Sequence, residues 1–341
     1  MEKTSRSLVL ETLEFRNRSG RVPRQLWTLP WADLHHPQEL AEIRSSFPDD
    51  IVEVPPSHKR YTQEPKRQGD WYAVGDYIDE WGCHFHNVHE GVIGEVKAPL
   101  ISEEDDEWEA ASKVHIPEEL LSIDTDRINE FCRSTNQFVL ASELARPFER
   151  MQFIRGTENL FVDLALQNPA MLAFLKRVHD FNCRLLRLWA STDVDGLFFM
   201  DDWGSQNSLL INPKLWVEYI KPLYKDYADI AKAAGKKIFF HSDGFTLDII
   251  PHLIDIGIDA VNLQIFCIGL EKLRPFAGKI CFWGEIDRQH LLPFGTTTEI
   301  GDAVRQARES LWKDGGAIAQ CEFGAGAKPE NVRAVFEAWQ G

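Results

Sequence analysis

The sequence predicts an α/β protein with a single (β/α)8 TIM barrel over residues 1–341, in which residues 30–120 form an elaborated, insertion-rich N-terminal region. From residue 120 onward, short apolar segments alternate with longer helical stretches, which is typical of βα units around a parallel sheet. A length of 341 residues suits one such barrel with insertions. The competing doubly wound sheet usually carries a glycine-rich phosphate turn, and neither GxGxxG nor GxxxxGK occurs here.

The elements follow in chain order. We expect an amphipathic helix within residues 1–20, and a β-hairpin built from residues 79–83 and 91–94 in the N-terminal elaboration. Apolar segments predict strands at residues 25–29, 51–54, 137–142, 196–200, 237–241, 260–265, 279–284 and 317–321. Helices are expected at residues 116–132, 169–190, 213–234, 246–256, 270–276, 298–313 and 329–339. Asn168 and Asn212, each followed by proline, provide N-caps for two of these helices.

Composition and charge exclude several classes of function. The net charge of −16 would repel a phosphate backbone, so we expect no nucleic-acid partner. No apolar segment approaches the roughly 20 residues that a membrane span needs, and the N-terminus has no signal-peptide core, so a cytoplasmic protein without a membrane partner is expected. The 6 cysteines are scattered without a CxxC pair, which indicates reduced thiols.

Polar residues follow five consecutive predicted strands. Barrel enzymes place their reacting groups at the C-terminal ends of the strands. The groups at these ends are Asp201, Asp202 and Gln206; His241, Ser242 and Asp243; Gln264; Glu285 and Asp287; and Cys321 and Glu322. Their convergence predicts an enzyme with its active site around His241.

The role of each group is open from the residues alone. His241 and Cys321 with a carboxylate from Asp243 or Glu285 could bind Zn²⁺, or His241 could act through hydrogen bonds while Cys321 is a buried apolar thiol.

Asp201 and Asp202 could form an acid–base pair or orient a ligand, and one of them could instead be a helix N-cap. Trp203 and Trp283 could line a substrate pocket or belong to the core.

A second group of possible ligands lies in the N-terminal elaboration. Cys83, His84, His86 and His89 match no standard spacing of metal ligands, and strand alternation places His84 and His86 on one face. We therefore expect structural or solvated histidines there.

Several segments resemble the uroporphyrinogen decarboxylase superfamily, and more closely its corrinoid-dependent methyltransferase branch than the decarboxylase itself. The matching segments are Asp79-Glu80-Trp81-Gly82, Arg155-Gly156-Thr157-Glu158-Asn159-Leu160, Asp201-Asp202-Trp203-Gly204-Ser205-Gln206, Pro213-Lys214-Leu215-Trp216, His241-Ser242-Asp243-Gly244, Gly284-Glu285-Ile286-Asp287 and Pro329-Glu330-Asn331-Val332. The arginine-containing segment by which the decarboxylase holds its porphyrinogen is not matched at residues 21–27.

The resemblance implies a zinc ion and a corrinoid (cobalamin) cofactor, the corrinoid being carried by a partner protein. In that branch a His-x-Cys pair and a later Cys bind zinc; His241 and Cys321 match, whereas Asp243 stands at the middle cysteine. Metal ligands are therefore expected at His241, Cys321 and Asp243, with Glu285 as an alternative to Asp243. Catalytic roles are expected for Asp202, Gln206 and Glu285, and substrate contacts for Asp201, Trp203, Gln264 and Trp283.

Three functions remain in competition. The first is zinc-assisted transfer of a methyl group between a small O- or N-methyl substrate and the corrinoid. The second is a metal-free decarboxylase or lyase of a small carboxylic acid or a tetrapyrrole-related substrate, in which Asp202 or His241 handles protons. The third is a non-catalytic binding barrel that has lost a ligand at Asp243. The acids at the strand ends disfavour the third.

Overall fold

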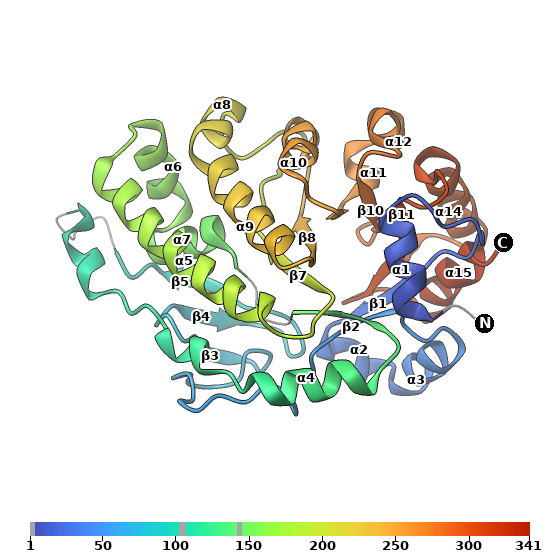
Figure 1. Ribbon diagram of the computed structural model, residues 1–341, viewed down its shortest axis with the longest axis horizontal. Coiled ribbons are helices and arrows are strands. Elements are labelled where there is room, and N and C mark those ends of the chain that lie inside the picture. The colour runs from blue at the N-terminus through green and yellow to red at the C-terminus, as the bar shows by residue number, and fades with distance from the viewer. Residues whose placement is uncertain (1–3, 102–106, 142–144) are drawn as a thin grey trace.

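The computed structural model describes residues 4–101, 107–141 and 145–341. Eight parallel strands form a nearly closed barrel in the order β1-β11-β10-β9-β8-β7-β6-β2 (Figure 1). Where β1 and β2 meet, the Asp50 N–H donates to the Arg24 carbonyl at 2.9 Å. The strands are β1 (Arg24–Thr28), β2 (Ile51–Glu53), β6 (Phe138–Leu140), β7 (Gly196–Met200), β8 (Lys237–Ser242), β9 (Ala260–Leu263), β10 (Cys281–Trp283) and β11 (Ala317–Phe323). The barrel and the position of each predicted strand are confirmed; residue 142 of one prediction lies outside the described residues.

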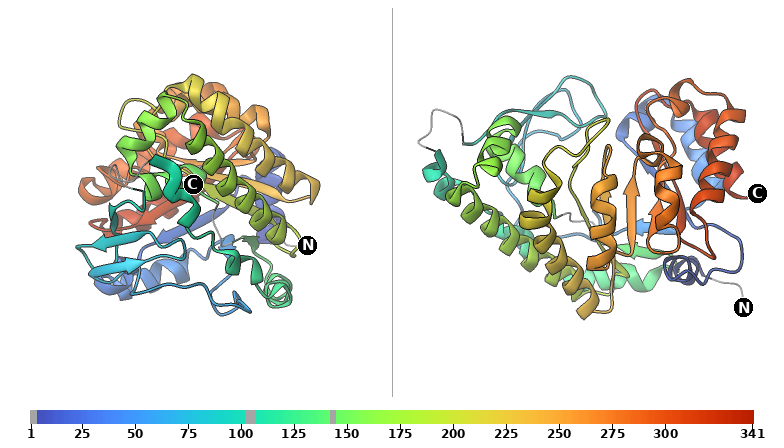
Figure 2. Two further views of the ribbon diagram at one scale, coloured as in Figure 1. Left: turned by 90° about the vertical axis from the view of Figure 1, so that its left-hand side faces the viewer. Right: turned by 90° about the horizontal axis from the view of Figure 1, so that it is seen from above.

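Helices surround the strands (Figure 2). Each predicted helix is present, and two of them consist of two elements. The first is the 3-10 turn Glu118–Ser122 followed by α4 (Thr125–Ser134), and the third is α8 (Pro213–Leu215) followed by α9 (Lys221–Ala233). The others are α7 (Pro169–Ala190), α10 (Ile250–Ile256), α12 (Leu270–Leu273), α14 (Thr297–Leu311) and α15 (Pro329–Trp339). Asn168 and Asn212 cap α7 and α8 as predicted. A π-helical turn, Trp216–Ile220, separates α8 from α9.

Several helices were not predicted. These are α2 (Pro30–His35), α3 (Pro37–Ser46), α5 (Pro147–Arg155), α6 (Thr157–Ala165), α11 (Ile265–Ile268) and α13 (Leu291–Phe294). All are short, and the first three begin at a proline. A proline indicates the start of a helix only when apolar residues at helical spacing continue beyond it, and in these short helices they do not continue far enough. Among them, α5 brings a functional side chain to the barrel mouth.

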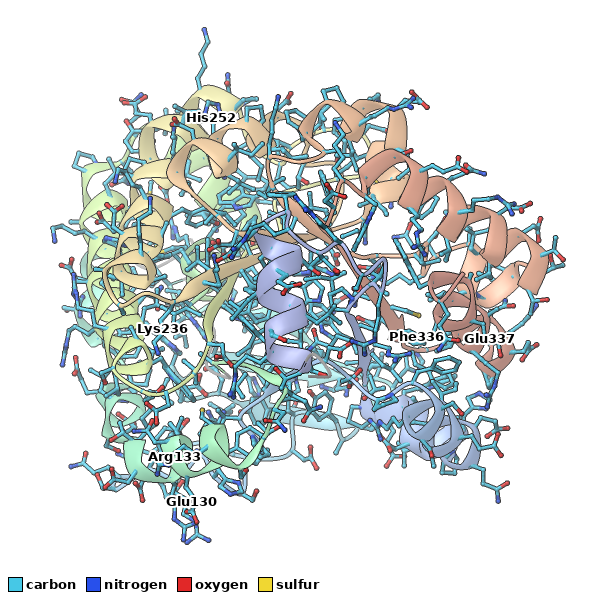
Figure 3. The ribbon with its side chains drawn as sticks, turned by 45° about the vertical axis from the view of Figure 1, so that its right-hand side comes forward. Glu130, Arg133, Lys236, His252, Phe336 and Glu337 are labelled. Atoms are coloured by element: carbon cyan, nitrogen blue, oxygen red, sulfur yellow. The ribbon has the colours of Figure 1, made fainter. Side chains whose placement is uncertain are left out.

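Helix α1 (Ser5–Leu13) closes the N-terminal end of the barrel and is shorter than the predicted segment of residues 1–20. Val9 and Leu13 pack against the inward-facing Phe138, Phe239 and Ile318 of the strands. Figure 3 looks toward this end, where α1 crosses the centre of the ring of helices. Any cavity inside the barrel therefore opens at the C-terminal ends of the strands.

The N-terminal elaboration contains an antiparallel sheet of β3 (Gly75–Ile78), β4 (His84–Asn87) and β5 (Glu95–Ala98). The predicted hairpin segments were wrong in position, because residues 79–83 and 91–94 are the connections between these strands, where glycines at positive φ reverse the chain. Phe85 packs its ring 5.2 Å from that of Phe153 on α5, which places the sheet beside the barrel mouth. His84 and His86 are both exposed on β4, as the alternation predicted.

Alternation along each strand divides the apolar core in two. Alternate residues such as Phe198, Phe239 and Trp283 fill the barrel interior, and their chain neighbours pack against the outer helices. Among the described residues, the helices lack a stretch of sufficient length and apolar character to span a bilayer.

Candidate active site

A cavity of ≈ 1090 Å³ opens at the C-terminal end of the barrel. The strands and the loops that follow them contribute Trp27, Phe198, Met200, Asp202, His241, Asp243, Arg288 and Glu322. The β3–β5 sheet and α5 form the opposite wall, with residues that include Tyr77, Phe85, Val96, Glu149 and Phe153. The cavity thus combines an aromatic lining with a concentration of charged groups, which is the usual composition of a small-molecule site.

His241 lines this cavity; it lies two residues beyond the inward-facing Phe239 and is 5% exposed. Asn262 Nδ2 donates to the Trp283 carbonyl at 2.5 Å, so its Oδ1 faces His241 Nδ1 at 2.6 Å. Because an amide oxygen only accepts, Nδ1 must carry a proton. In the neutral ring the Nε2 lone pair therefore faces the cavity.

Two carboxylates face that nitrogen. Asp202 Oδ1 lies 3.5 Å and Asp243 Oδ1 lies 3.7 Å from His241 Nε2. The Asp243 N–H donates to Asp202 Oδ1 at 2.9 Å, which ties together the loops that follow β7 and β8. Asp243 Oδ1 is buried and has no hydrogen-bond partner within the described part of the chain. Three ligand atoms within 4.8 Å of one another, one of them unsatisfied, could hold a metal ion.

A third carboxylate, Glu149, reaches the cavity from the start of α5. Its Oε2 is buried without a hydrogen-bond partner among the described residues, and Arg146 Nη1 lies 3.9 Å from it. Burial raises the pKa of Glu149, and the nearby Asp202 raises it further, against the opposing effect of Arg146. A carboxyl group of raised pKa in a cavity can donate a proton near neutral pH.

Arg288 joins three acids on the other side of the cavity. Its side chain forms ion pairs with Asp243, with Glu285 Oε1 at 3.0 Å and with Glu322 Oε2 at 3.1 Å. Burial raises the pKa of Glu285 well above its usual range, and Arg288 opposes that rise. Burial lowers the pKa of Arg288, but the three acids outweigh it and raise that pKa above its usual value, so the guanidinium stays charged at any working pH.

Three predicted site residues lie outside the lining of the cavity. Asp201 is fully buried, and its carboxylate accepts from the Glu149 N–H at 2.8 Å and from the Tyr224 hydroxyl at 2.6 Å. Trp203 is also fully buried and donates to the same hydroxyl at 2.7 Å. Trp283 lies deeper in the barrel, with its ring 5.0 Å from that of Trp27. Asp201 therefore anchors the α5 N-terminus, and the two tryptophans lie in the core.

Cys321 is not brought together with His241. Strand β11 pairs with β1, and Leu26 lies opposite Cys321 while Trp27 lies opposite Glu322. Trp27 and Glu322 line the cavity, whereas Leu26 and Cys321 belong to the outer core against the helices. Burial raises the pKa of Cys321 well above its usual range, and Glu285 and Glu322 add to the rise. The side chain that β11 presents to the mouth is Glu322.

The remaining predicted residues gather in a side cavity of ≈ 100 Å³. Gln206, Gln264 and Glu285 line it together with Asp287 and Arg288. Gln264 Oε1 accepts from the Gly244 N–H at 3.2 Å, and Asp287 caps the turn that follows by accepting from two backbone N–H groups. Arg288 lines both cavities and so forms the partition between them.

Sequence reasoning missed Glu149 and Arg288, and it counted Glu322 among the strand-end groups without giving it a role in the site. Arg288 directly follows Asp287 in a strand-end segment, so extending the strand-end rule by one residue would have included it. Glu322 would have followed from alternation, given that Ile318 of the same strand faces inward. Glu149 had no such signal, because α5 was not predicted.

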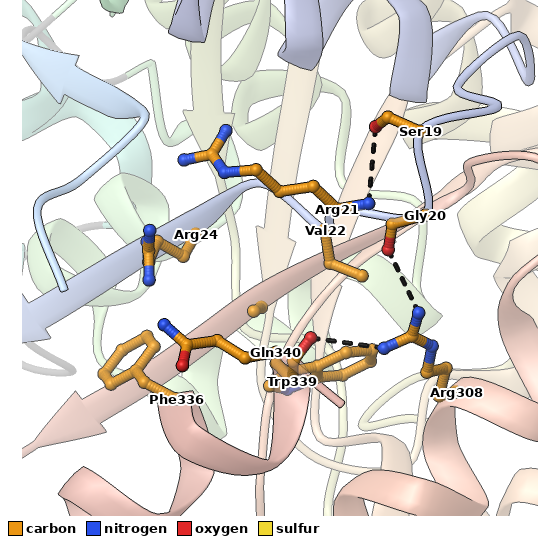
Figure 4. A pocket seen from close by; sticks show the side chains of 10 residues that line it. Ser19, Gly20, Arg21, Val22, Arg24, Arg308, Phe336, Trp339 and Gln340 are labelled. Atoms are coloured by element: carbon orange, nitrogen blue, oxygen red, sulfur yellow. Dashed lines mark hydrogen bonds between the residues drawn. The ribbon is translucent and has the colours of Figure 1, made fainter.

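Another cavity, of ≈ 500 Å³, lies at the α1 end of the barrel and is lined by Arg21, Arg24 and Arg308 (Figure 4). Arg308 is bound to the Gly20 and Trp339 carbonyls at 3.0 and 3.2 Å, and Arg21 pairs with Asp50 at 2.8 Å. Arg308 and Arg21 thus hold segments near the chain termini against the barrel. The cluster of His241, Asp202 and Asp243 lies at the opposite end of the barrel.

A methyltransferase from Methanosarcina mazei superposes with a TM-score of 0.67 at 14% identity, covering 99% of each chain. A GH10 endo-β-1,4-xylanase from Gloeophyllum trabeum gives a TM-score of 0.45 at 10% identity, covering 97% of this chain and 99% of its own. Among curated proteins, no sequence matches the chain. The model of the uroporphyrinogen decarboxylase (URO-D) family matches residues 79–341, and the protein therefore belongs to that family.

Proposed function

We propose that this protein is a methyltransferase that moves a methyl group between a small O- or N-methyl substrate and a corrinoid held by a partner protein, assisted by a zinc ion at His241. The observation that carries the proposal is the cluster of His241 Nε2, Asp202 and Asp243 beneath an open cavity. The likeness to a methyltransferase structure supports it at the level of the fold.

The cluster fits a metal ion by geometry and by chemistry. Ligand atoms about 2.0–2.2 Å from a tetrahedral zinc lie about 3.3–3.6 Å apart, and the nitrogen–oxygen separations here are 3.5 and 3.7 Å. Arg288 pairs with Asp243 Oδ2 and leaves the buried Oδ1 without a hydrogen-bond partner, so that oxygen is available to a metal ion. Asp243 keeps the ligand role expected for it, Asp202 takes the place of the expected Cys321 thiolate, and Cys321 is not part of the proposed site.

When bound, the zinc ion supplies a Lewis acid that polarises the oxygen or nitrogen bearing the methyl group, and the corrinoid supplies the cobalt that exchanges it. Carboxylate ligands keep such an ion harder than thiolates would, which favours an O- or N-methyl donor over a thiol. His241 holds Nε2 toward the cavity through the Asn262 hydrogen bond. Glu149 is the group placed to give a proton to the departing oxygen or nitrogen.

A partner that carries the corrinoid would approach the open side of the cavity. Ile93, in the connection between β4 and β5, lines the cavity and is 50% exposed; Val88 in the same connection and Val74 just before β3 are each 63% exposed. Exposed apolar side chains at the rim of a functional site are typical of docking surfaces.

The test compares the zinc content of the purified wild-type protein with that of three variants. We expect His241→Ala and Asp243→Ala each to hold one equivalent less than wild type, and Cys321→Ala to hold the same amount. Zinc content unchanged in the first two variants would overturn the metal site. Formation of methylcobalamin from cob(I)alamin and a panel of methoxylated and N-methylated compounds, absent in His241→Ala, then tests the reaction.

A decarboxylase of a small carboxylic acid is the second candidate. Lys59, Arg67, Arg146 and Arg288 line the same cavity and offer positive charge to a carboxylate substrate. Such an enzyme would release CO₂ from its substrate with the same rate after zinc is removed by chelation. Methyl transfer that disappears on chelation decides for the first candidate.

A further inference from the structure

A second cluster of metal-ligating side chains lies in the outer helix layer. His179 and Cys183 are four residues apart on α7, so they share one face of that helix. Asp226 faces them from α9, which packs beside α7. His179 and Cys183 are 7% and 5% exposed, and none of the three residues lines the active-site cavity.

The distances within this cluster suit a single small cation. His179 Nε2 lies 3.0 Å from Asp226 Oδ2 and 3.5 Å from Cys183 Sγ. A tetrahedral zinc with bonds of about 2.0 Å to nitrogen and oxygen and about 2.3 Å to sulfur needs ligand separations of about 3.3–3.5 Å. The three ligand atoms all lie within 4.8 Å of one another, so closure around an ion requires small side-chain movements only.

The histidine is oriented by a second layer of hydrogen bonds. Its Nδ1 lies 3.3 Å from the Tyr227 hydroxyl, which also accepts from Asn182 Nδ2 at 3.4 Å. Without an ion, Nε2 donates its proton to the Asp226 carboxylate, which can only accept, and the Tyr227 hydroxyl donates to Nδ1. When an ion takes the place of the Nε2 proton, the neutral ring adopts the other tautomer, in which Nδ1 donates to the hydroxyl and the Nε2 lone pair is directed at the ion. An outer hydrogen bond of this kind is the usual support of a metal-binding histidine.

The cluster is accessible from one side. The Asp226 side chain is 59% exposed, and a surface hollow lined by Arg187, Asp226 and Asp229 adjoins it. An ion can therefore enter without unfolding the helices, and a water molecule can complete its coordination.

We propose that His179, Cys183 and Asp226 bind one Zn²⁺ ion that links α7 to α9. The mixed nitrogen, sulfur and oxygen donors select zinc over Mg²⁺ or Ca²⁺, which prefer oxygen ligands. On binding, the Cys183 thiol gives its proton to water and the sulfur takes up the ion as a thiolate. Because the ligands come from two helices that meet only in the folded chain, the ion stabilises the packing of α7 on α9.

Cobalt(II) distinguishes this site from the one at the barrel mouth, because a cobalt–thiolate charge-transfer band requires a sulfur ligand. We expect Co²⁺ titration of metal-free protein to give that band with one-equivalent saturation, and Zn²⁺ to displace it. The band persists in His241→Ala, whose mouth site is removed, and in the control Cys132→Ser, which changes a buried thiol of α4. It disappears in Cys183→Ser.

Asp226→Asn provides a variant that leaves the buried part of the cluster in place, and we expect it to weaken Co²⁺ binding at least tenfold. Wild-type protein should also gain thermal stability on addition of Zn²⁺, by an amount that Cys183→Ser does not share. A band that is absent from wild type, that persists in Cys183→Ser, or that disappears in Cys321→Ala would overturn the proposal. Binding that appears only at millimolar metal would indicate an adventitious ion and overturn it as well.

Discussion

Asp243 and Arg288 form an ion pair across the barrel mouth and thereby join the loop after β8 to the loop after β10. The same guanidinium pairs with Glu285 and Glu322, so one cation holds three acids from three strand ends. A site that gathers this much negative charge is held together by its counter-ion. Arg288 is therefore the positioning residue on which the geometry of Asp243 depends.

Replacing Arg288 by alanine should destabilise the protein by about 2–3 kcal/mol. Removing one partner of a fully buried ion pair costs about 3–5 kcal/mol, and the value is smaller here because Arg288 is 26% exposed while Glu285 is 2% exposed. Urea unfolding measures the loss. Arg305→Ala, which removes an exposed pair with Asp302, is the control and should cost at most about 0.5 kcal/mol. Equal losses in the two variants would contradict the role of Arg288.

Asn262→Ala should weaken zinc binding at the mouth about 10–100-fold, because the variant loses the acceptor that fixes the His241 tautomer. Zinc titration against a chromogenic chelator measures the change. Asn129→Ala removes a backbone contact to Asp193 far along the chain from the site and should leave zinc affinity unaltered. Undiminished affinity in Asn262→Ala would mean that the ring is oriented by its packing alone.

The fold was predictable because the strands that form it are short apolar segments separated by helices, a pattern that local sequence records. The cluster of Asp202, His241 and Asp243 was predictable for the same reason, since the ends of parallel strands meet at one face. The predicted role of Cys321 depended on a family spacing, and spacing does not say to which side of a strand a residue points. In β11, inward-facing Ile318 places Glu322 in the mouth and Cys321 behind it.

Contacts that depend on close approach of distant segments were beyond the sequence. Glu149 enters the site because its backbone N–H donates to the Asp201 carboxylate. From the sequence alone, Asp201 could equally have had a functional or a structural role, so this contact was not predictable. Gly204 and Gly244 lie in separate motifs, and only the structure brings their backbones together, with the Gly204 N–H donating to the Asp243 carbonyl at 3.0 Å.

Gly244→Ala should therefore destabilise the protein by about 3 kcal/mol and reduce metal binding at the mouth. Its φ of +78° is unfavourable for alanine, and the added Cβ would overlap the Gly204 carbonyl and displace the loops that carry Asp202 and Asp243. Gly235→Ala is matched in backbone, with φ of +67°, but nothing lies within 4 Å of its Cβ. It should cost about 1 kcal/mol and leave metal binding unchanged. Similar effects in both variants would show that the loops do not need this approach.

The free energy of unfolding should fall as the pH rises from about 4 to 7, because of the titration of Asp49. Burial raises the pKa of Asp49 to about 6, although its Oδ1 accepts from the Leu26 N–H at 2.7 Å. The folded protein therefore holds this proton more tightly than the unfolded chain, whose carboxyl group has the ordinary value of 3.8. The stabilisation is complete below that value and is lost as the pH passes through about 6.

Asp49→Asn keeps an oxygen acceptor for the Leu26 N–H and removes the titration. Relative to wild type, its free energy of unfolding should rise by up to about 3 kcal/mol between pH 4 and 7, as measured by urea unfolding across that range. A constant difference between the two proteins would show that Asp49 titrates normally.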